Sequence, residues 1–374
     1  MELSIVMPCL NEGETLGLCI KKIKKNLKSL NISSEIIVAD NGSSDESILI
    51  ANKEKVKIVH VKKKGYGSAL KRGIFHAKGK YILFADADCS YDFNLIPKFY
   101  KEISKGYDLV QGCRLPKHGG KIKPGAMPIL HRYLGNPFLS TIAKAFHQLP
   151  FNDIYCGMRI FRKKIYKNTK IISDGMVFAI EHLIKTCLIS KKVKEIPITL
   201  HKDKRIKNKS HLKTFSDGFE SLKFLLIFLP KIIFLIPSIV ISLVALYFII
   251  QTSNFDSMVN FQMNFKIFIS ILLFLLSYQI MLFGIASKFI ASEIGFSSKN
   301  ENYFFKIFKL RYSIFATIFL LVLAFIMNFF NFSFVNEKMR ILMTILLVYF
   351  STINLINSIM ISLIEFLSKK NNYN

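Results

Sequence analysis

Two carboxylates that follow a short apolar stretch are the residues whose types and spacing are best suited to chemistry. Residues 81–85 read as a buried parallel strand, and Asp86 and Asp88 come immediately after it. On an extended backbone, side chains two residues apart lean to the same side. Ligands of an open α/β sheet bind just beyond the carboxyl ends of its strands. The pair therefore predicts a site for Mg²⁺ and a phosphorylated substrate, and the alternative is an acidic turn that caps the following helix.

The stretches around this pair predict the fold class. Short apolar strands alternate with helices through the first part of the chain, which is typical of a parallel, wound α/β sheet. The expected strands are 3–8, 35–40, 56–61, 81–85, 107–112 and 193–199, and the expected helices include 15–30, 45–54 and 176–188. A glycine-bearing loop over 62–68 and a second loop over 201–213 are both rich in lysine.

The charge balance limits the class of partner. The chain has 52 basic and 25 acidic residues, which gives a formal net charge of +27. Such an excess suits nucleic acid, an anionic membrane surface or a phosphorylated substrate. No recognised nucleic-acid-binding motif accompanies the charge, so we expect no nucleic-acid partner. The six cysteines show no C-x-x-C spacing, which predicts free thiols in a reducing compartment.

The second part of the chain reads as a membrane domain. Four apolar runs of about 20 residues, each long enough to cross a bilayer, lie at 232–251, 267–287, 312–334 and 341–366. Lysine and arginine gather before the first run, between the second and third, and after the last. The positive-inside rule then places residues 1–230, the 288–311 loop and the C-terminus on the cytoplasmic side. A buried hydrophobic domain is the alternative, and packing of four spans would support an oligomer.

These observations divide the chain into four expected parts. Residues 1–214 form a cytoplasmic catalytic domain, and residues 215–231 form a juxtamembrane amphipathic helix that lies in the membrane interface. Residues 232–366 form the membrane domain of four helices, and residues 367–374 form a cytoplasmic tail.

Six short segments carry a resemblance to a known family. They are Val6–Glu12 (VMPCLNE), Val38–Asp45 (VADNGSSD), Gly65–Ala69 (GYGSA), Ala85–Asp88 (ADAD), Gln111–Arg114 (QGCR) and Asp153–Arg159 (DIYCGMR). In this order they resemble the family-two, GT-A type glycosyltransferases, most of all the polyprenyl-phosphate branch of dolichol-phosphate mannose or glucose synthases. The resemblance covers about residues 3–230, and the membrane part is similar only in kind. It implies a GT-A α/β domain with a mostly parallel wound sheet, followed by four transmembrane helices.

The resemblance also implies a donor site. The nucleotide sugar, of UDP-glucose or GDP-mannose type, would be bound by Pro8, Leu10, Glu12, Val38, Asp40, Asp86, Ala87, Asp88 and Arg114. Asp40 can accept hydrogen bonds from a base N–H group, although a helix-capping role is the alternative. Asp86 and Asp88 would hold Mg²⁺ or Mn²⁺ against the diphosphate. Ser90 stands where the relatives often have a glutamine near the metal, and it is the third candidate metal ligand.

The acceptor implied by the resemblance is a polyprenyl phosphate, dolichyl or undecaprenyl, at the membrane surface. Arg205 and His211, in the basic loop before the first apolar run, are the candidate phosphate binders, and a solvated charged surface is the alternative for this loop. For Arg114 the alternative is a surface ion pair. Asp153 is the candidate for orienting or deprotonating the acceptor, and Glu181 is its rival. The expected reaction is a metal-dependent transfer of a hexose that inverts the anomeric centre, at the cytoplasmic membrane face.

Two other functions compete with this interpretation. One is a membrane glycosyltransferase that extends a lipid-linked glycan or a polysaccharide. Processive synthases carry a Gln-x-x-Arg-Trp segment, and this sequence has no tryptophan. The other is a non-catalytic basic membrane protein, against which the pair of Asp86 and Asp88 argues.

Overall fold

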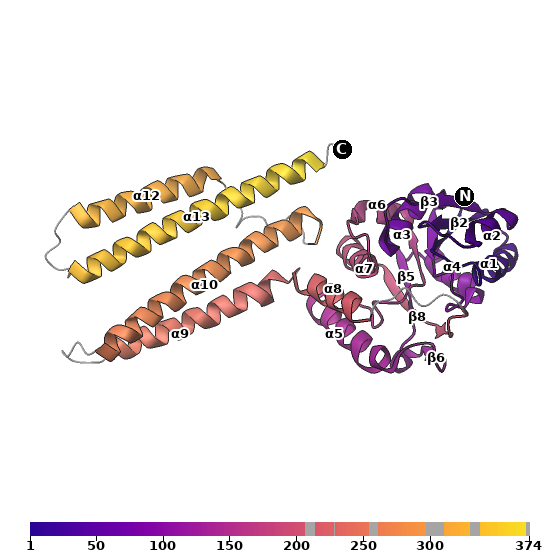
Figure 1. Ribbon diagram of the computed structural model, residues 1–374, viewed down its shortest axis with the longest axis horizontal. Coiled ribbons are helices and arrows are strands. Elements are labelled where there is room, and N and C mark those ends of the chain that lie inside the picture. Colours follow the sequence, from indigo (N-terminus) through magenta and orange to yellow (C-terminus); the bar gives the residue numbers. More distant parts are fainter. Residues whose placement is uncertain (206–213, 228, 254–260, 297–309, 330–336, 372–374) are drawn as a thin grey trace. The chain divides into compact units, whose positions relative to one another are not determined.

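The structure, a computed structural model, describes residues 1–205, 214–227, 229–253, 261–296, 310–329 and 337–371 (Figure 1). The predicted phosphate binder His211 lies outside these residues. The chain divides into two compact units, Met1–Leu225 and Leu226–Asn374.

The first unit is built on a seven-stranded sheet with the strand order β3-β2-β1-β4-β7-β5-β8. Neighbouring strands are parallel except at β7, which runs antiparallel to both β4 and β5. The predicted mostly parallel, wound sheet is confirmed. The strands are β1 (Leu3–Cys9), β2 (Ser34–Asp40), β3 (Lys57–His60), β4 (Tyr81–Phe84), β5 (Leu109–Cys113), β7 (Arg159–Arg162) and β8 (Val193–Pro197).

Helices cover both faces of this sheet, since β1 presents buried side chains to each of them. Leu3, Ile5 and Met7 belong to one core with the buried faces of α1 (Leu16–Leu30) and α4 (Ile96–Ser104). Val6 points to the other face, where Gly73 of α3 (Tyr66–His76) lies so close that a Cβ atom there would be 2.5 Å from Val6 Cγ1. The remaining helices of the sheet region are α2 (Ser47–Lys53), η1 (Phe93–Leu95), α6 (Lys163–Thr169) and α7 (Phe178–Ile189).

A second, two-stranded sheet returns the chain to the end of β4. Its strands β6 (Lys121–Ile122) and β9 (Thr199–Leu200) are parallel. After β9 the backbone runs along residues 88–90. His201 N donates to Ser90 O at 2.8 Å, and Lys204 N donates to Asp88 O at 3.2 Å. This return brings Arg205 to Asp88 and Glu12. The helices outside the main sheet are η2 (Pro116–His118), η3 (His131–Gly135), α5 (Asn136–His147) and α8 (Thr214–Ile227).

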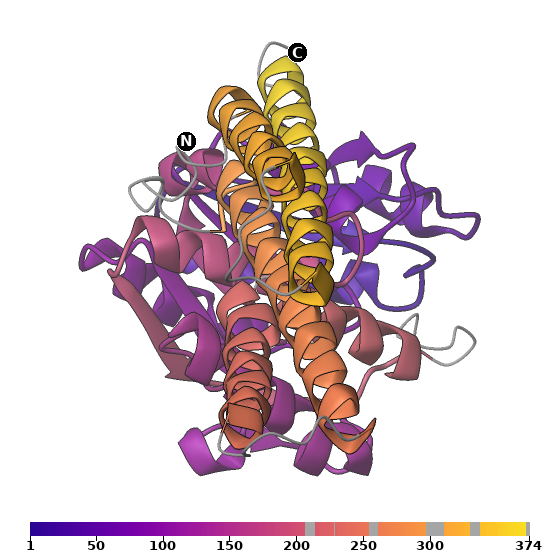
Figure 2. The same cartoon turned by 90° about the vertical axis from the view of Figure 1, so that its left-hand side faces the viewer.

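The secondary structure of the second unit, as far as its residues are described, is helical. Its elements are η4 (Lys231–Leu235), α9 (Ile236–Ser253), α10 (Phe261–Glu293), α12 (Leu310–Phe329) and α13 (Glu337–Asn371), and α9 packs along α10 as α12 does along α13 (Figure 2). Among the described residues, Lys231–Gln251, Lys266–Glu293 and Met343–Leu363 are long and apolar enough to cross a membrane, while the apolar part of α12, Arg311–Ile326, is shorter. Length and composition therefore mark this unit as a membrane domain, with three of the four expected spans at full length.

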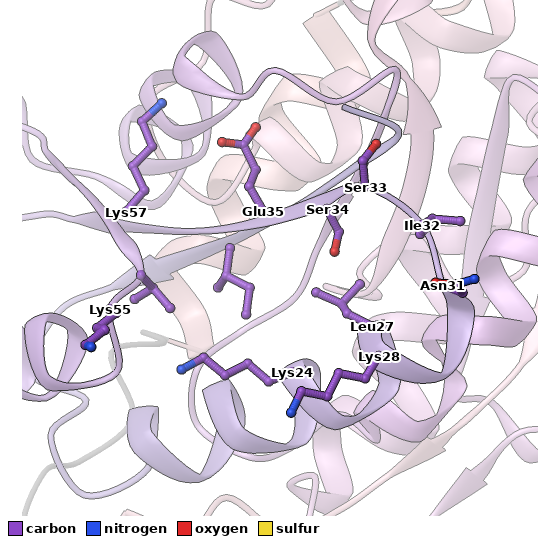
Figure 3. A pocket seen from close by; sticks show the side chains of 12 residues that line it. Lys24, Leu27, Lys28, Asn31, Ile32, Ser33, Ser34, Glu35, Lys55 and Lys57 are labelled. Carbon is purple, nitrogen blue, oxygen red and sulfur yellow. The ribbon is translucent and has the colours of Figure 1, made fainter.

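A cavity of about 780 Å³ lies at the amino ends of β2 and β3, the edge of the sheet opposite to Asp86 and Asp88 (Figure 3). Leu27 and Ile36 contribute apolar surface to its lining. The labelled lysines, among them Lys28 and Lys57, spread around the rim and their ammonium groups do not converge on one point (Figure 3). The cavity is therefore separate from the site built by the predicted residues.

Candidate active site

The carboxyl ends of β1, β2 and β4 meet at one edge of the sheet and carry most of the predicted donor-site residues. The parallel register pairs Cys9 with Asp40, so β1 and β2 end at the same level, and it pairs Val6 with Phe84, so β4 ends three residues earlier on the same side of β1. Glu12 follows β1, Asp86 follows β4, and Asp40 is the last residue of β2. Parallel strands place the groups that follow them together, as the sequence pattern predicts.

Asp86 and Asp88 are held by hydroxyl and amide donors. Asp86 Oδ1 accepts a hydrogen bond from the Tyr66 hydroxyl at 2.9 Å. Asp88 Oδ1 accepts from the amide and the hydroxyl of Ser90, at 2.9 and 2.5 Å. Burial, together with the nearby charge of Asp88, raises the pKa of Asp86 to about 7. Ala87 between them is buried, so its side chain turns away from solvent while the two carboxylates flank it.

Arg205 joins the ends of two strands through its guanidinium. Its Nη1 is 3.0 Å from Glu12 Oε1, and its Nη2 is 3.3 Å from Asp88 Oδ2. Asp203 forms a third ion pair with the same group at 2.5 Å. Burial raises the pKa of Glu12 to about 8, and the Arg205 charge opposes that rise. The positive charge of Arg205 offsets the repulsion between the carboxylates that the fold brings together.

The predicted base-binding residues lie at the ends of β1 and β2. Pro8 and Leu10 are half-buried there, while Val38 is buried within β2. Asp40 is also buried, and its two carboxylate oxygens accept hydrogen bonds from the backbone amides of Gly42 at 3.2 Å and Ser43 at 3.0 Å. Asp40 thus shapes the turn after β2, and its contact with a nucleotide base stays a prediction.

Asp153 and Arg114, predicted separately for the acceptor and the donor, are bound to each other. Arg114 donates from Nε to Asp153 Oδ2 at 2.7 Å and from Nη2 to Oδ1 at 2.8 Å, and its backbone amide adds a third bond at 2.9 Å. The Asp153 side chain is 0% exposed. Glu195 fixes the Asp153 backbone amide at 3.0 Å. Asp153 therefore positions Arg114, and its predicted role toward an acceptor stays a prediction.

Glu181, the rival for that role, is equally enclosed. Its carboxylate pairs with Lys185 at 2.6 Å and accepts hydrogen bonds from the amides of Ile172 at 3.0 Å and Ser173 at 2.8 Å. The side chain is 0% exposed. Glu181 thus fastens the segment before α7, and its role as a base stays a prediction.

The chemistry of the donor set fits a hard divalent cation. The side chains at the end of β4 offer carboxylate and hydroxyl oxygens, the ligands that Mg²⁺ and Mn²⁺ take. Among the described residues, no group of three or more His, Cys, Asp and Glu side chains is arranged to hold a metal by itself. Two carboxylates suffice for Mg²⁺ when substrate phosphates and water supply the other ligands. Asp86 and Asp88 would hold the ion, with Ser90 beside Asp88.

Comparison with known proteins decides the family. Residues 4–169 match the family model described as Glycosyl transferase family 2. The chain is also 33% identical, over 284 residues, to the low-salt glycan biosynthesis hexosyltransferase Agl6 of Haloferax volcanii, covering 75% of this chain and 67% of that protein. The chain belongs to glycosyl transferase family 2. It is a glycosyltransferase with the GT-A fold followed by a helical region, as the resemblance in the sequence implies.

Other similar proteins are more distant from this glycosyltransferase. The dolichol-phosphate mannosyltransferase of Pyrococcus furiosus is 29% identical over 205 residues, which are 53% of this chain and 56% of that protein. A crystal structure of glucosyl-3-phosphoglycerate synthase from Mycobacterium tuberculosis, in complex with Mn²⁺, UDP-glucose and phosphoglyceric acid, aligns with a TM-score of 0.48 at 16% identity. That alignment covers 60% of this chain and 77% of the synthase.

Sequence reasoning missed two residues that this glycosyltransferase places against Asp86. Tyr66 binds its Oδ1 atom, and a Cβ atom at Gly157 would lie 2.7 Å from its Oδ2 atom and 3.0 Å from the Tyr91 hydroxyl. Both residues belong to the segments that carried the family resemblance. Their spacing along the chain gave no sign that they lie beside Asp86.

A Gly157→Ala variant should lower the rate of sugar transfer by about tenfold or more, because the added methyl group displaces the Asp86 carboxylate. Gly175→Ala is the matched control, since a Cβ atom there meets nothing within 4 Å. Initial rates of the purified variants check the prediction. Equal rates for both alanine variants would show that Asp86 tolerates a shifted position.

Proposed function

We propose that this enzyme transfers a hexose from a nucleotide-diphospho-sugar, of UDP-glucose or GDP-mannose type, to a polyprenyl phosphate at the cytoplasmic membrane face. The transfer depends on Mg²⁺ or Mn²⁺ and inverts the anomeric carbon. The observation that carries the proposal is the cluster of Asp86, Asp88, Glu12 and Arg205 at the strand ends of a chain that also has membrane-spanning helices.

The donor half of the reaction rests on the charges at the end of β4. A divalent cation held by Asp86 and Asp88 would neutralise negative charge on the departing nucleoside diphosphate. The Arg205 side chain is 8% exposed and pairs with Glu12 and Asp88, and its guanidinium has the fork geometry that binds phosphate oxygens in pairs. Arg205 therefore suits a phosphate at this site, either of the donor or of the lipid.

The proposal of a phosphate acceptor rests on the contacts that the two candidate bases make. Asp153 is enclosed by its ion pair with Arg114. Glu181 is enclosed by its ion pair with Lys185 and by hydrogen bonds from two backbone amides. A phosphate oxygen is already anionic near neutral pH and needs no base to remove a proton. Enclosed carboxylates are thus compatible with a phosphate acceptor, and an in-line attack on an α-linked donor would give a β-linked product.

The catalytic unit has an apolar surface that suits a lipid interface. Large apolar side chains on and beside η3 and α5 are exposed, from 44% for Phe146 to 78% for Ile129. An amphipathic helix with such a face lies in the boundary between headgroups and acyl chains. The positive-inside rule, applied to the lysines and arginines flanking the spans, favours the cytoplasmic side for this unit. The names of the Haloferax and Pyrococcus relatives, which concern glycan biosynthesis and dolichol phosphate, agree with a lipid-linked acceptor.

The proposal predicts label transfer into lipid. Membranes that contain the protein are incubated with polyprenyl phosphate, Mn²⁺ and a panel of radiolabelled nucleotide sugars. We expect one donor to bring label into the organic phase. Label in water-soluble polymer would instead favour chain extension, and no transfer from any donor in the panel would contradict the proposed donor and acceptor classes. Membranes without the protein are the control.

A further inference from the structure

Tyr66 stands at the first position of α3 and reaches the end of β4. Its hydroxyl donates a hydrogen bond to Asp86 Oδ1 at 2.9 Å. A hydrogen bond to an ionised carboxylate is about twice as strong as one between neutral groups. It fixes the rotation of the carboxylate about its last bond, while Gly157 leaves room for the other oxygen.

The backbone on both sides of Tyr66 is clamped by the segment 172–174. Gly65 has a φ of +132°, and a Cβ atom there would collide with the carbonyl oxygen of Asp174. A Cβ atom at Gly67 would lie 2.7 Å from Ser173 O. Only glycine permits these approaches, so the two glycines let the segment close over the start of α3.

Hydrogen bonds and ion pairs hold the 172–174 segment against the start of α3. Ser68 N donates to Asp174 O at 3.0 Å, and Ser68 Oγ donates to Asp174 Oδ1 at 2.9 Å. Lys71 Nζ lies 2.6 Å from the same carboxylate oxygen, and Lys63 pairs with the other oxygen. Glu181, on α7, accepts hydrogen bonds from the backbone amides of Ile172 and Ser173 in the same segment. The 172–174 segment is therefore bound to two elements, α3 and α7, and it holds the start of α3 that carries Tyr66.

We propose that Tyr66 is a positioning residue that orients Asp86 for the divalent cation, and that the 172–174 segment holds Tyr66 in place. This inference rests on the proposed metal-dependent function. Ligating carboxylates depend on such outer partners, and removing a partner typically weakens metal binding by about 10- to 100-fold. Tyr66 acts through Asp86 and does not itself touch the substrate.

Mn²⁺ binding to the purified full-length protein tests the proposal. The electron paramagnetic resonance signal of free Mn²⁺ gives the affinity without any sugar donor. We expect Tyr66→Phe to weaken binding by about 10- to 100-fold, with a smaller loss for Asp174→Asn. Tyr166→Phe is the matched control: it removes a phenol hydroxyl from an aromatic cluster with Phe161 and His182, and its affinity should equal that of the native protein.

The rate of transfer as a function of Mn²⁺ concentration gives the second readout. Positioning of Asp86 predicts that the half-saturating Mn²⁺ concentration of Tyr66→Phe rises by the same factor, while kcat recovers at saturating Mn²⁺. Equal Mn²⁺ affinity in the native protein and Tyr66→Phe overturns the proposal, as does a loss of kcat that excess Mn²⁺ does not restore. Native protein that binds Mn²⁺ yet transfers no sugar would instead overturn the proposed function, because the binding result stands without a donor.

Discussion

An Asp88→Asn variant should transfer hexose at least about a thousandfold more slowly than the native enzyme. The amide keeps the size of the side chain but removes the negative charge that faces both the cation and Arg205. A thousandfold corresponds to about 4 kcal/mol of transition-state stabilisation, which lies within the several kcal/mol that a metal ion contributes. Initial rates with saturating donor and Mn²⁺ measure the effect.

Asp92→Asn is the matched control for this variant. Asp92 lies four residues further along, and its side chain accepts a hydrogen bond from the Asn94 amide at the start of η1. Asparagine can make the same cap, so the rate should stay within about twofold of the native value. A native rate in Asp88→Asn would show that the reaction does not need the Asp88 carboxylate as a metal ligand.

An Asp153→Ala variant should destabilise the catalytic unit by about 3–5 kcal/mol, because it leaves the Arg114 guanidinium buried without its partner. For a unit of this size the melting temperature should fall by roughly 6–20 °C. Differential scanning calorimetry of the full-length protein measures the shift, since the chain has no tryptophan for fluorescence.

A second Asp–Arg pair provides the comparison for Asp153. Asp108 and Arg162 lie 3.0 Å apart but are partly exposed, so Asp108→Ala should cost about 1 kcal/mol or less. Replacing Asp153 and Arg114 together with leucine should recover part of the lost stability. If Asp153→Ala melts like the native protein while its transfer rate collapses, Asp153 acts on the acceptor and the positioning role assigned from the structure is wrong.

The sequence predicted the parts of the fold that local patterns determine. Strand and helix alternation placed β1, β2, β3 and β4 within a few residues, because apolar runs and turn residues act over short distances. The Asp86 and Asp88 pair was found for the same reason, since both residues follow one strand. The antiparallel position of β7 between β4 and β5 depends on pairing between distant segments, and no local pattern reports that pairing.

The contacts of the site were harder to predict because they join residues far apart in the chain. Arg114 and Asp153 were each singled out, yet their ion pair spans 39 residues and depends on how β5 and the segment before β7 meet. Arg205 reaches Asp88 only because the chain returns along residues 88–90 after β9. Tyr66 reaches Asp86 across the sheet edge, and its role is visible only once α3 is in place.

Mass spectrometry of the lipid product shows whether the enzyme attaches a hexose to polyprenyl phosphate and whether the reaction needs the metal. Purified protein is incubated with the donor identified in the panel, polyprenyl phosphate and Mn²⁺, with a chelator added to a parallel sample. We expect polyprenyl phosphate that carries a single hexose, formed by the native enzyme and absent with the chelator or with Asp88→Asn. Product that forms equally with the chelator, or sugar found only on longer glycans, would contradict it.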